Sequence, residues 1–251
     1  MSSNSAAVLY GKGIFTTIAI RAGAPLFWEK HWRRLTSDAA KVGVVLAEYT
    51  EASVRQLLGD TLAAQGVSDG KARITFCDER PGIVWPGPQP EHRAGIHIIA
   101  GPLMPRPPRF RATVSPYTVN SQSPLAGVKS CNYMENILAG NEARSRGFTE
   151  AIRLNERGHV AGGTMSNVFW LVGGALFTPS LATGCLPGTT REFVLENLEC
   201  SEVEAGIDEL KTADAIYLTS AGLGIATVAE YNGRKLHSAP HPIAQILTNN
   251  Y

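Results

Sequence analysis

The sequence lacks the features that would assign it to a specialised class of protein. No apolar run approaches the length needed to span a bilayer. The first residues, MSSNSAAVLYGKG, contain neither a basic segment nor a long apolar stretch, so no signal peptide is expected. The 23 basic and 22 acidic residues give a net charge of +1, which attracts neither nucleic acid nor an anionic membrane. These absences favour an ordinary globular protein of the cytoplasm.

Cysteine is scarce as well. The four cysteines, Cys77, Cys131, Cys185 and Cys200, are far apart in the sequence and form no C-x-x-C pair. Such spacing does not suit a disulfide framework or a zinc site. We therefore expect reduced thiols, as in a cytoplasmic protein, and no bound metal.

The first half of the chain predicts a small α+β domain. At 251 residues the chain is long enough for one large domain or two small ones. Strands are expected at 13–23, 72–78 and 95–101, and helices at 30–44 and at 50–66, where Thr50 can cap the start. A Pro- and Ser-rich stretch, 102–127, contains one strand-like piece at 109–115. We predict an N-terminal domain at 1–117, a linker at 118–127 and a larger C-terminal domain at 128–251.

The second half predicts a further mixture of strands and helices. Helices are expected at 132–148, 189–198 and 201–211, strands at 150–155 and 215–220, and hairpins at 168–180 and 225–236. Asn232-Gly233 is a strong two-residue turn signal in the last hairpin. Because strands and helices do not alternate strictly, the pattern favours an α+β fold over a doubly wound parallel sheet.

Lys129 is the first candidate for chemistry. The chain has seven lysines against sixteen arginines, and Lys129 lies in the apolar-patterned stretch AGVKSCNYMENILAGNEA, 126–143. Most lysines are solvated, and a surface role is the simple alternative. Apolar neighbours such as Val128 and Tyr133 would instead disfavour the ammonium and lower its pKa. A neutral amine of this kind can form an imine with a carbonyl compound.

Two glycine- and hydroxyl-rich turns in the second half suit an anion. LPGTTR, 186–191, opens a predicted helix, and LTSAGLG, 218–224, follows a predicted strand. Backbone N–H groups at such turns bind phosphate, although Gly-Thr-Thr also serves as an ordinary helix cap. Arg34, in HWRRL, would add bidentate phosphate recognition, unless it is a solvated helix residue. Together these features suit a phosphorylated cofactor better than any of them does alone.

Five motifs in order resemble the class IV (fold type IV) aminotransferase family. They are YGKGIFTT, EKHWRRLTSDA, KSCNYMENILA, SNVFW with LFTPS, and GCLPGTTREFVLE. The family includes branched-chain aminotransferases, D-amino acid aminotransferases and 4-amino-4-deoxychorismate lyases. The resemblance covers residues 10 to 228 and implies a D-amino acid aminotransferase-like fold of two α+β domains. It also implies pyridoxal 5'-phosphate (PLP) between the domains, a small-molecule amino substrate and a homodimer.

The resemblance assigns roles to individual residues. Lys129 takes the place of the Schiff-base lysine, which holds PLP and moves the substrate proton. Arg34 matches the phosphate-binding arginine of the family. Tyr133 matches a tyrosine near the phenolic oxygen of the cofactor, and Phe15 lies on the strand that lines the substrate side.

The two phosphate turns also have counterparts in the family. Thr189 and Thr190 match the phosphate site at the helix start, and Ser220 matches the second turn. Ala221 stands where a threonine is frequent and can offer only its backbone N–H.

Gly162 departs from the family pattern. The family segment reads roughly Val-x-Glu-Gly-x-x-Ser-Asn-x-Phe, whereas this chain has HVAGGTMSNVFW, with Gly162 in the place of the glutamate. A carboxylate there keeps the pyridine nitrogen protonated, so that the ring can absorb electrons. Glu150 and Glu156 are near in sequence but are expected to point elsewhere. A water or another side chain would have to fill the gap.

The reaction type is argued from this departure. A transaminase must hold a carbanion until it is reprotonated, whereas a lyase expels a leaving group as the carbanion forms. Loss of the glutamate at position 162 should therefore harm transamination more than elimination. GKGIFTT also resembles the lyases. Against this, CDERPGIVW lacks their Arg-Gly-rich loop and the substrate-carboxylate arginine pattern of D-amino acid aminotransferases. Arg73 and Arg80 are the candidates for a substrate carboxylate, and loops 78–92 and 104–124 are expected to set substrate preference.

Three hypotheses follow. The balance slightly favours a 4-amino-4-deoxychorismate lyase-like enzyme that produces pyruvate and an aromatic amine such as 4-aminobenzoate. The first alternative is a transaminase of D-amino acids, branched-chain amino acids or amines. The second is a PLP-binding protein with little turnover, because of Gly162.

Overall fold

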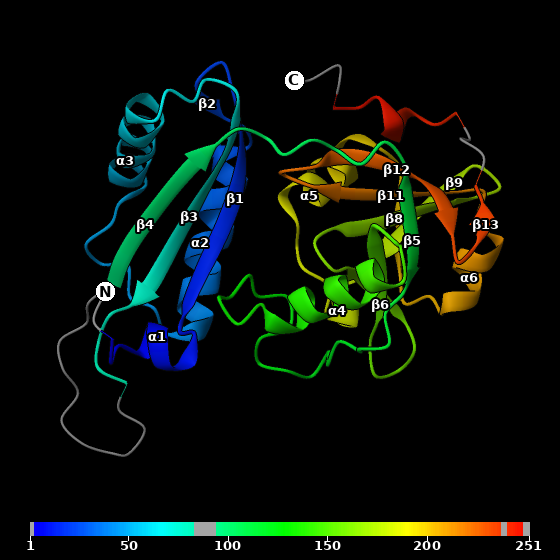
Figure 1. The fold of residues 1–251 in the computed structure, drawn as a ribbon, viewed down its shortest axis with the longest axis horizontal. Coiled ribbons are helices and arrows are strands. Elements are labelled where there is room, and N and C mark those ends of the chain that lie inside the picture. The colour runs from blue at the N-terminus through cyan, green and yellow to red at the C-terminus, as the bar shows by residue number, and fades with distance from the viewer. Residues whose placement is uncertain (1–2, 83–93, 237–239, 248–251) are drawn as a thin grey trace. The chain divides into compact units, whose positions relative to one another are not determined.

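A computed structural model describes residues 3–82, 94–236 and 240–247 (Figure 1). The chain divides into two compact units. The N-terminal unit is Met1–Met104 with Val128–Tyr133, and the C-terminal unit is Pro105–Gly127 with Met134–Tyr251. Helices and strands are mixed in both, so the predicted α+β class is confirmed. The sequence-based domain boundaries stay a prediction. Within the described ranges, no helix has the length and apolar character needed to cross a membrane.

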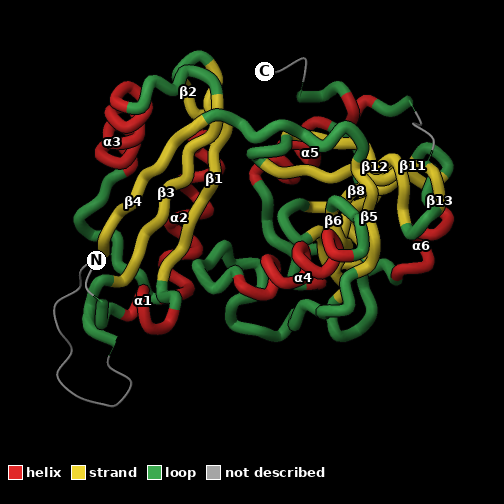
Figure 2. The backbone as a smooth tube through the Cα atoms, in the orientation of Figure 1, coloured by secondary structure: helices red, strands yellow, loops and turns green. Residues whose placement is uncertain are grey.

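The N-terminal unit is a four-stranded antiparallel sheet with two long helices (Figure 2). Its elements are α1 (Ala6–Tyr10), β1 (Gly13–Arg21), β2 (Ala24–Pro25), α2 (Trp28–Val42), α3 (Glu51–Ala64), β3 (Gly70–Asp78) and β4 (Ala94–Gly101). The strand order is β2-β1-β3-β4. The strands and helices predicted for this half are confirmed, whereas the short α1 and β2 were not predicted.

Alternation along β1 separates the two faces of this sheet. Ile14, Ile18 and Ile20 are fully buried and pack with residues of α2 and α3 in one hydrophobic core. Because successive strand residues point to opposite faces, Phe15 lies on the other face. The predicted cap of α3 is confirmed, since the Thr50 hydroxyl accepts a hydrogen bond from the backbone N–H of Ser53 at 3.1 Å.

The C-terminal unit contains a nine-stranded mixed sheet. Its strands are β5 (Phe110–Val114), β6 (Glu150–Leu154), β7 (Val160–Gly163), β8 (Asn167–Val172), β9 (Ala175–Pro179), β10 (Ser201–Val203), β11 (Ala215–Ser220), β12 (Gly224–Tyr231) and β13 (Arg234–Lys235). Its α-helices are α4 (Met134–Ser145), α5 (Thr189–Asn197) and α6 (Ile207–Thr212), and 3-10 turns occur at Leu181–Thr183 and Pro242–Ala244. The order is β10-β9-β8-β11-β12-β5-β6-β7, with β13 paired to β12. Three of the pairings, β10–β9, β12–β5 and β5–β6, are parallel, and the other pairings are antiparallel.

The helix predicted at 201–211 is wrong over its first half. Residues Ser201–Val203 form β10, which pairs in parallel with β9, and the helix begins only at Ile207 after the cap residue Gly206. Pairing with a neighbouring strand decided the structure of this segment. The predicted hairpin at 225–236 is confirmed. Asn232 and Gly233 both have positive φ, 47° and 82°, as a tight hairpin turn requires.

The segment Val128–Tyr133 pairs with β1. Ser130 forms an isolated bridge with Ile14, and the N–H of Phe15 donates to the carbonyl of Lys129 at 2.9 Å. The N–H of Cys131 donates to the carbonyl of Gly13 at 2.8 Å. These hydrogen bonds hold Lys129 at the edge of the N-terminal sheet.

Candidate active site

The amine of Lys129 lies against two aromatic rings. Its Nζ is 4.5 Å from the centre of the Phe15 ring, 4.7 Å from that of Tyr133, and 3.2 Å from the Tyr133 hydroxyl oxygen. The two rings meet edge to face at 5.2 Å. β1 supplies Phe15, and the segment paired to β1 supplies the other two residues. The structure thus brings together three of the residues singled out in the sequence.

The surroundings of Lys129 disfavour its ammonium form. Part of the residue remains exposed, but the atoms packed around the amine are the main reason that its pKa falls, to about 7. The positive charges of Arg34 and Arg73 lower this pKa further, and the carboxylate of Asp38 opposes them. A substantial fraction of Lys129 is therefore neutral near pH 7, as the sequence argument requires of an imine-forming lysine.

Asp38 holds the backbone of this lysine. Its Oδ2 accepts a hydrogen bond from the N–H of Lys129 at 3.0 Å, and the residue is only 2% exposed. Burial raises the pKa of Asp38, while the hydrogen bond and the nearby cations oppose that rise. Sequence reasoning missed this residue. The available signal was its spacing, because Asp38 lies on the buried stripe of α2 with His31 and Leu35.

Two arginine side chains lie close enough to Lys129 to act on its charge. Arg34 is buried on α2 and donates from Nη2 to the Thr16 hydroxyl at 2.7 Å. The guanidinium of Arg73 lies 3.5 Å from the centre of the Phe15 ring, and its Nε donates to Thr75 at 3.1 Å. With Lys129, these arginines form a cluster suited to an anionic ligand.

Arg80 is engaged in an ion pair. Its Nη2 lies 2.6 Å from Oδ2 of Asp78, which also contacts the Lys12 amine at 3.0 Å. Burial alone would raise the pKa of Asp78, but the hydrogen bonds from Arg80 and Lys12 outweigh it and lower this pKa to about 2. Of the predicted substrate loop 78–92, residues 83–92 lie outside the described residues.

The start of α5 contains a buried hydroxyl suited to phosphate. Thr189 and Thr190 are buried in its first turn, and the cap residue Gly188 offers no side chain. Among the atoms that the structure describes, Oγ1 of Thr190 has no hydrogen-bond partner. A side chain at Gly188 would collide with Asn167, because a Cβ there would lie 2.0 Å from Oδ1 of Asn167. An anion at the helix N-terminus would satisfy the hydroxyl.

The turn after β11 offers similar groups. The Ser220 hydroxyl accepts from the N–H of Leu223 at 3.2 Å, and Ala221 follows in the same turn. Thr219 is fully buried, and no described atom pairs with its Oγ1. Sequence reasoning did not single out Thr219, although it lies inside the quoted motif.

Gly162 lies on β7 opposite Arg153 of β6. Its φ is +153°, a conformation that L side chains rarely adopt, and a Cβ there would lie 3.3 Å from the carbonyl oxygen of Ser166. The backbone at this position is therefore shaped around a glycine.

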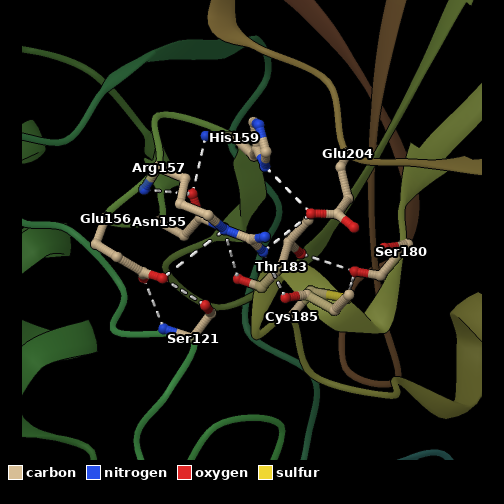
Figure 3. Close-up of polar contacts among 10 residues, drawn as sticks. Ser121, Asn155, Glu156, Arg157, His159, Ser180, Thr183, Cys185 and Glu204 are labelled. Atoms are coloured by element: carbon tan, nitrogen blue, oxygen red, sulfur yellow. Dashed lines mark hydrogen bonds and ion pairs between the residues drawn. The ribbon is translucent and has the colours of Figure 1, made fainter.

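The two nearby acids are both engaged elsewhere. Glu150 is buried and accepts from the backbone N–H of Thr164 at 2.9 Å, from the hydroxyl of Thr164, and from the hydroxyl of Ser166 at 3.0 Å. Glu156 accepts from the N–H and the hydroxyl of Ser121, at 2.8 and 2.6 Å, in the polar cluster of Figure 3. Both carboxylates therefore already accept hydrogen bonds within the protein.

Each unit by itself offers groups that suit part of a phosphorylated carbonyl cofactor. The N-terminal unit offers a partly neutral amine beside two guanidinium groups, and the C-terminal unit offers buried hydroxyls at two turns. In the portion of the chain that is described, no group of three His, Cys, Asp or Glu side chains is placed to hold a metal ion.

Comparison with known proteins agrees with this chemistry. The model of the amino-transferase class IV family matches residues 13–231. The aminodeoxychorismate lyase of Bacillus subtilis is 30% identical over 228 residues, which cover 86% of this chain and 76% of that protein.

Two solved structures are similar over nearly the whole chain. The 4-amino-4-deoxychorismate lyase of Pseudomonas aeruginosa has a TM-score of 0.86 at 25% identity and covers 99% of this chain and 93% of its own. The branched-chain aminotransferase of Thermoproteus uzoniensis, with norvaline, has a TM-score of 0.89 at 27% identity and covers 99% and 87%. The chain belongs to the class IV aminotransferase family of PLP-dependent enzymes.

Proposed function

We propose that Lys129 is the residue that binds PLP covalently and moves the substrate proton. The observation that carries this proposal is the amine itself, with a pKa of about 7, packed between Phe15 and Tyr133. Such an amine attacks an aldehyde when neutral and serves as a general base near neutral pH. The Tyr133 hydroxyl, 3.2 Å from Nζ, would orient it.

The remaining residues would hold the cofactor and the substrate. Arg34, Thr189 and Thr190 would bind the phosphate, together with the turn at Ser220 and Ala221. Arg73, beside the lysine, would bind a substrate carboxylate, for which Arg80 is the weaker candidate because it is paired with Asp78. Bound PLP supplies a ring that withdraws electrons from the carbon bearing the substrate amine.

For the reaction we favour elimination of the aminodeoxychorismate lyase type. Lys129 would take a proton from the carbon that bears the amine, and the neighbouring carbon–oxygen bond would break. The products would be pyruvate and an aromatic amine such as 4-aminobenzoate. The missing carboxylate at Gly162 supports this choice because elimination needs the electron sink for less time, and Glu150 and Glu156 are engaged elsewhere.

Two alternatives remain. The similarity to a branched-chain aminotransferase supports a transaminase of branched-chain amino acids, D-amino acids or amines. A protein that binds PLP with little turnover would follow if the loss at Gly162 is not compensated. A cytoplasmic homodimer stays part of the proposal.

The first test is to fix PLP on the protein with borohydride and locate it by peptide mass spectrometry. We expect the added mass on Lys129, and no fixation in Lys129→Ala. Equal fixation without Lys129, or fixation on another lysine, would refute its role. Production of 4-aminobenzoate from 4-amino-4-deoxychorismate, compared with amino transfer from a panel of amino acids, then separates the three hypotheses.

A second test addresses Gly162. Gly162→Glu would restore the carboxylate, and Gly162→Ala and Gly162→Gln would report the backbone strain and the bulk without the charge. If only the Gly162→Glu variant raises amino transfer, the protein is a transaminase that lacks the carboxylate supporting its electron sink. If elimination is the same in the Glu and Gln variants and amino transfer stays absent, the lyase hypothesis is supported.

A further inference from the structure

Three buried polar side chains form a hydrogen-bonded chain between α2 and β1. Nη2 of Arg34 lies 2.7 Å from Oγ1 of Thr16, and the same oxygen lies 2.6 Å from Nδ1 of His31. Thr16 is 0% exposed, and His31 is 1% exposed. Polar groups buried this deeply are retained when they are mutually satisfied. The residue roles assigned above do not explain this series of hydrogen bonds.

The direction of the hydrogen bonds follows from the chemistry of the groups. A guanidinium only donates, so the Thr16 oxygen accepts from Arg34. Burial, and then the charges of Arg34 and Lys129, hold the pKa of His31 well below its usual value, so the ring is neutral. The Thr16 hydroxyl then donates to Nδ1, and the ring proton resides on Nε2. The two hydrogen bonds therefore run in one direction, from the guanidinium to the imidazole.

The geometry makes Thr16 a rigid support for Arg34. Thr16 lies in the middle of β1, opposite Ile74 of β3, so its backbone is held within the sheet. Its β-branched side chain has few rotamers. His31 and Arg34 are three residues apart on α2 and therefore share one helix face, which contacts β1 (Figure 1). A long arginine side chain would otherwise sample many conformations, and ordering them has an entropic cost.

We propose that Thr16 and His31 are positioning residues that orient the Arg34 guanidinium toward the phosphate of PLP. This inference rests on the proposed function, in which Arg34 binds that phosphate. Neither residue touches the cofactor in this proposal. Their effect acts through Arg34 and therefore falls on the phosphate, whereas the influence of Arg34 on the pKa of Lys129 is shared by PLP and by a compound without the phosphate.

The experiment compares PLP with pyridoxal, which lacks the phosphate. Affinities of the full-length apoprotein for both compounds are measured by absorbance titration. For Thr16→Val, which keeps the shape but removes the hydroxyl, we expect PLP affinity to fall about 10-fold and pyridoxal affinity to change less than about 2-fold. His31→Leu should reduce PLP affinity about 3-fold or more, because the hydroxyl loses its acceptor.

Two further variants serve as controls. Thr16→Ser keeps the hydroxyl and should restore PLP affinity to within about 2-fold of wild type. Thr61→Val removes a hydroxyl on α3, where Thr61 donates to the carbonyl of Leu57 at 2.7 Å, and should leave both affinities unchanged. Circular dichroism checks the fold, and if Thr16→Val does not fold, Thr16→Ala and His31→Leu decide.

The outcomes separate this inference from the proposed function. Equal losses of PLP and pyridoxal affinity, or no loss of PLP affinity in Thr16→Val, would overturn the positioning role. Failure of the proposed function has a different signature, in which wild type binds PLP no more tightly than pyridoxal, or Lys129→Ala binds PLP as tightly as wild type. A selective loss of PLP affinity that Thr16→Ser restores supports the proposal.

Discussion

Removing the charge of Arg73 should raise the pKa of the Lys129 amine. The Arg73 guanidinium and the Lys129 amine lie 3.5 and 4.5 Å from the centre of the same Phe15 ring. The two charges are therefore at most about 8 Å apart, where their repulsion at an effective dielectric constant of about 20 is about 2 kcal/mol. This corresponds to about 1.5 pKa units, and partial exposure and salt reduce it to about one unit.

The variant is Arg73→Met, which keeps an unbranched apolar stem over the ring of Phe15. The neighbouring cation disfavours the ammonium form of Lys129, so its removal should move the pKa upward from about 7. Burial and Arg34 remain, and the pKa should therefore stay below that of an ordinary lysine.

The assay measures how the modification rate of each lysine in the apoprotein depends on pH. A trace of isotopically labelled acetic anhydride modifies only neutral amines, and mass spectrometry assigns the product to individual peptides. The six other lysines serve as internal references. Arg73→Lys keeps the charge and should leave the midpoint of Lys129 near that of wild type. An unchanged midpoint in Arg73→Met, or an equal rise in Arg73→Lys, would refute the electrostatic reasoning.

Three further predictions follow from the buried acids and the buried histidine. Asp38→Asn should lower the pKa of Lys129 below 7, because it removes a carboxylate that favours the ammonium form in the wild-type protein. A rise of this pKa in the same labelling assay would contradict the prediction. The pKa of His31 is lowered in the folded protein, so just below pH 6.5 the imidazole gains a proton only in the unfolded chain. The free energy of unfolding should therefore decrease as the pH is lowered. His31→Leu should reduce that slope, measured by urea unfolding between pH 5 and 7, by up to about 1.4 kcal/mol per pH unit, and an unaltered slope would argue against it. Glu150→Gln should lower the free energy of unfolding by about 2–3 kcal/mol, because the amide brings a donor among buried donors. Glu156→Gln, at an exposed pair, should change stability little, and equal losses in the two variants would be inconsistent with the different burial.

Local sequence signals were sufficient for much of the fold. The Asn232-Gly233 turn and the Thr50 cap were predicted because each depends on a few neighbouring residues. The helix predicted at 201–211 was wrong over its first half because the outcome depended on β9, a strand distant in sequence. Strand pairing of this kind is decided by partners that no local pattern contains.

The residues around Lys129 show the same division. Its apolar neighbours and the motif order drew attention to the lysine, and the family was recognised in the sequence. Asp38, in contrast, was visible only as a polar position on an apolar helix stripe. Its contact with Lys129 spans 91 residues of chain and could not be inferred from spacing.

The sequence by itself determined the family, most of the secondary structure and the absence of a carboxylate at Gly162, because these depend on residue identity and short-range pattern. Only the tertiary structure decided that segment 128–133 pairs with β1 and that Thr16, His31 and Asp38 lie beside the candidate site. The physical reason is that the pKa of a lysine and the orientation of an arginine depend on burial and on charges a few ångströms away. In this chain those charges come from a strand and a helix far from Lys129 in sequence.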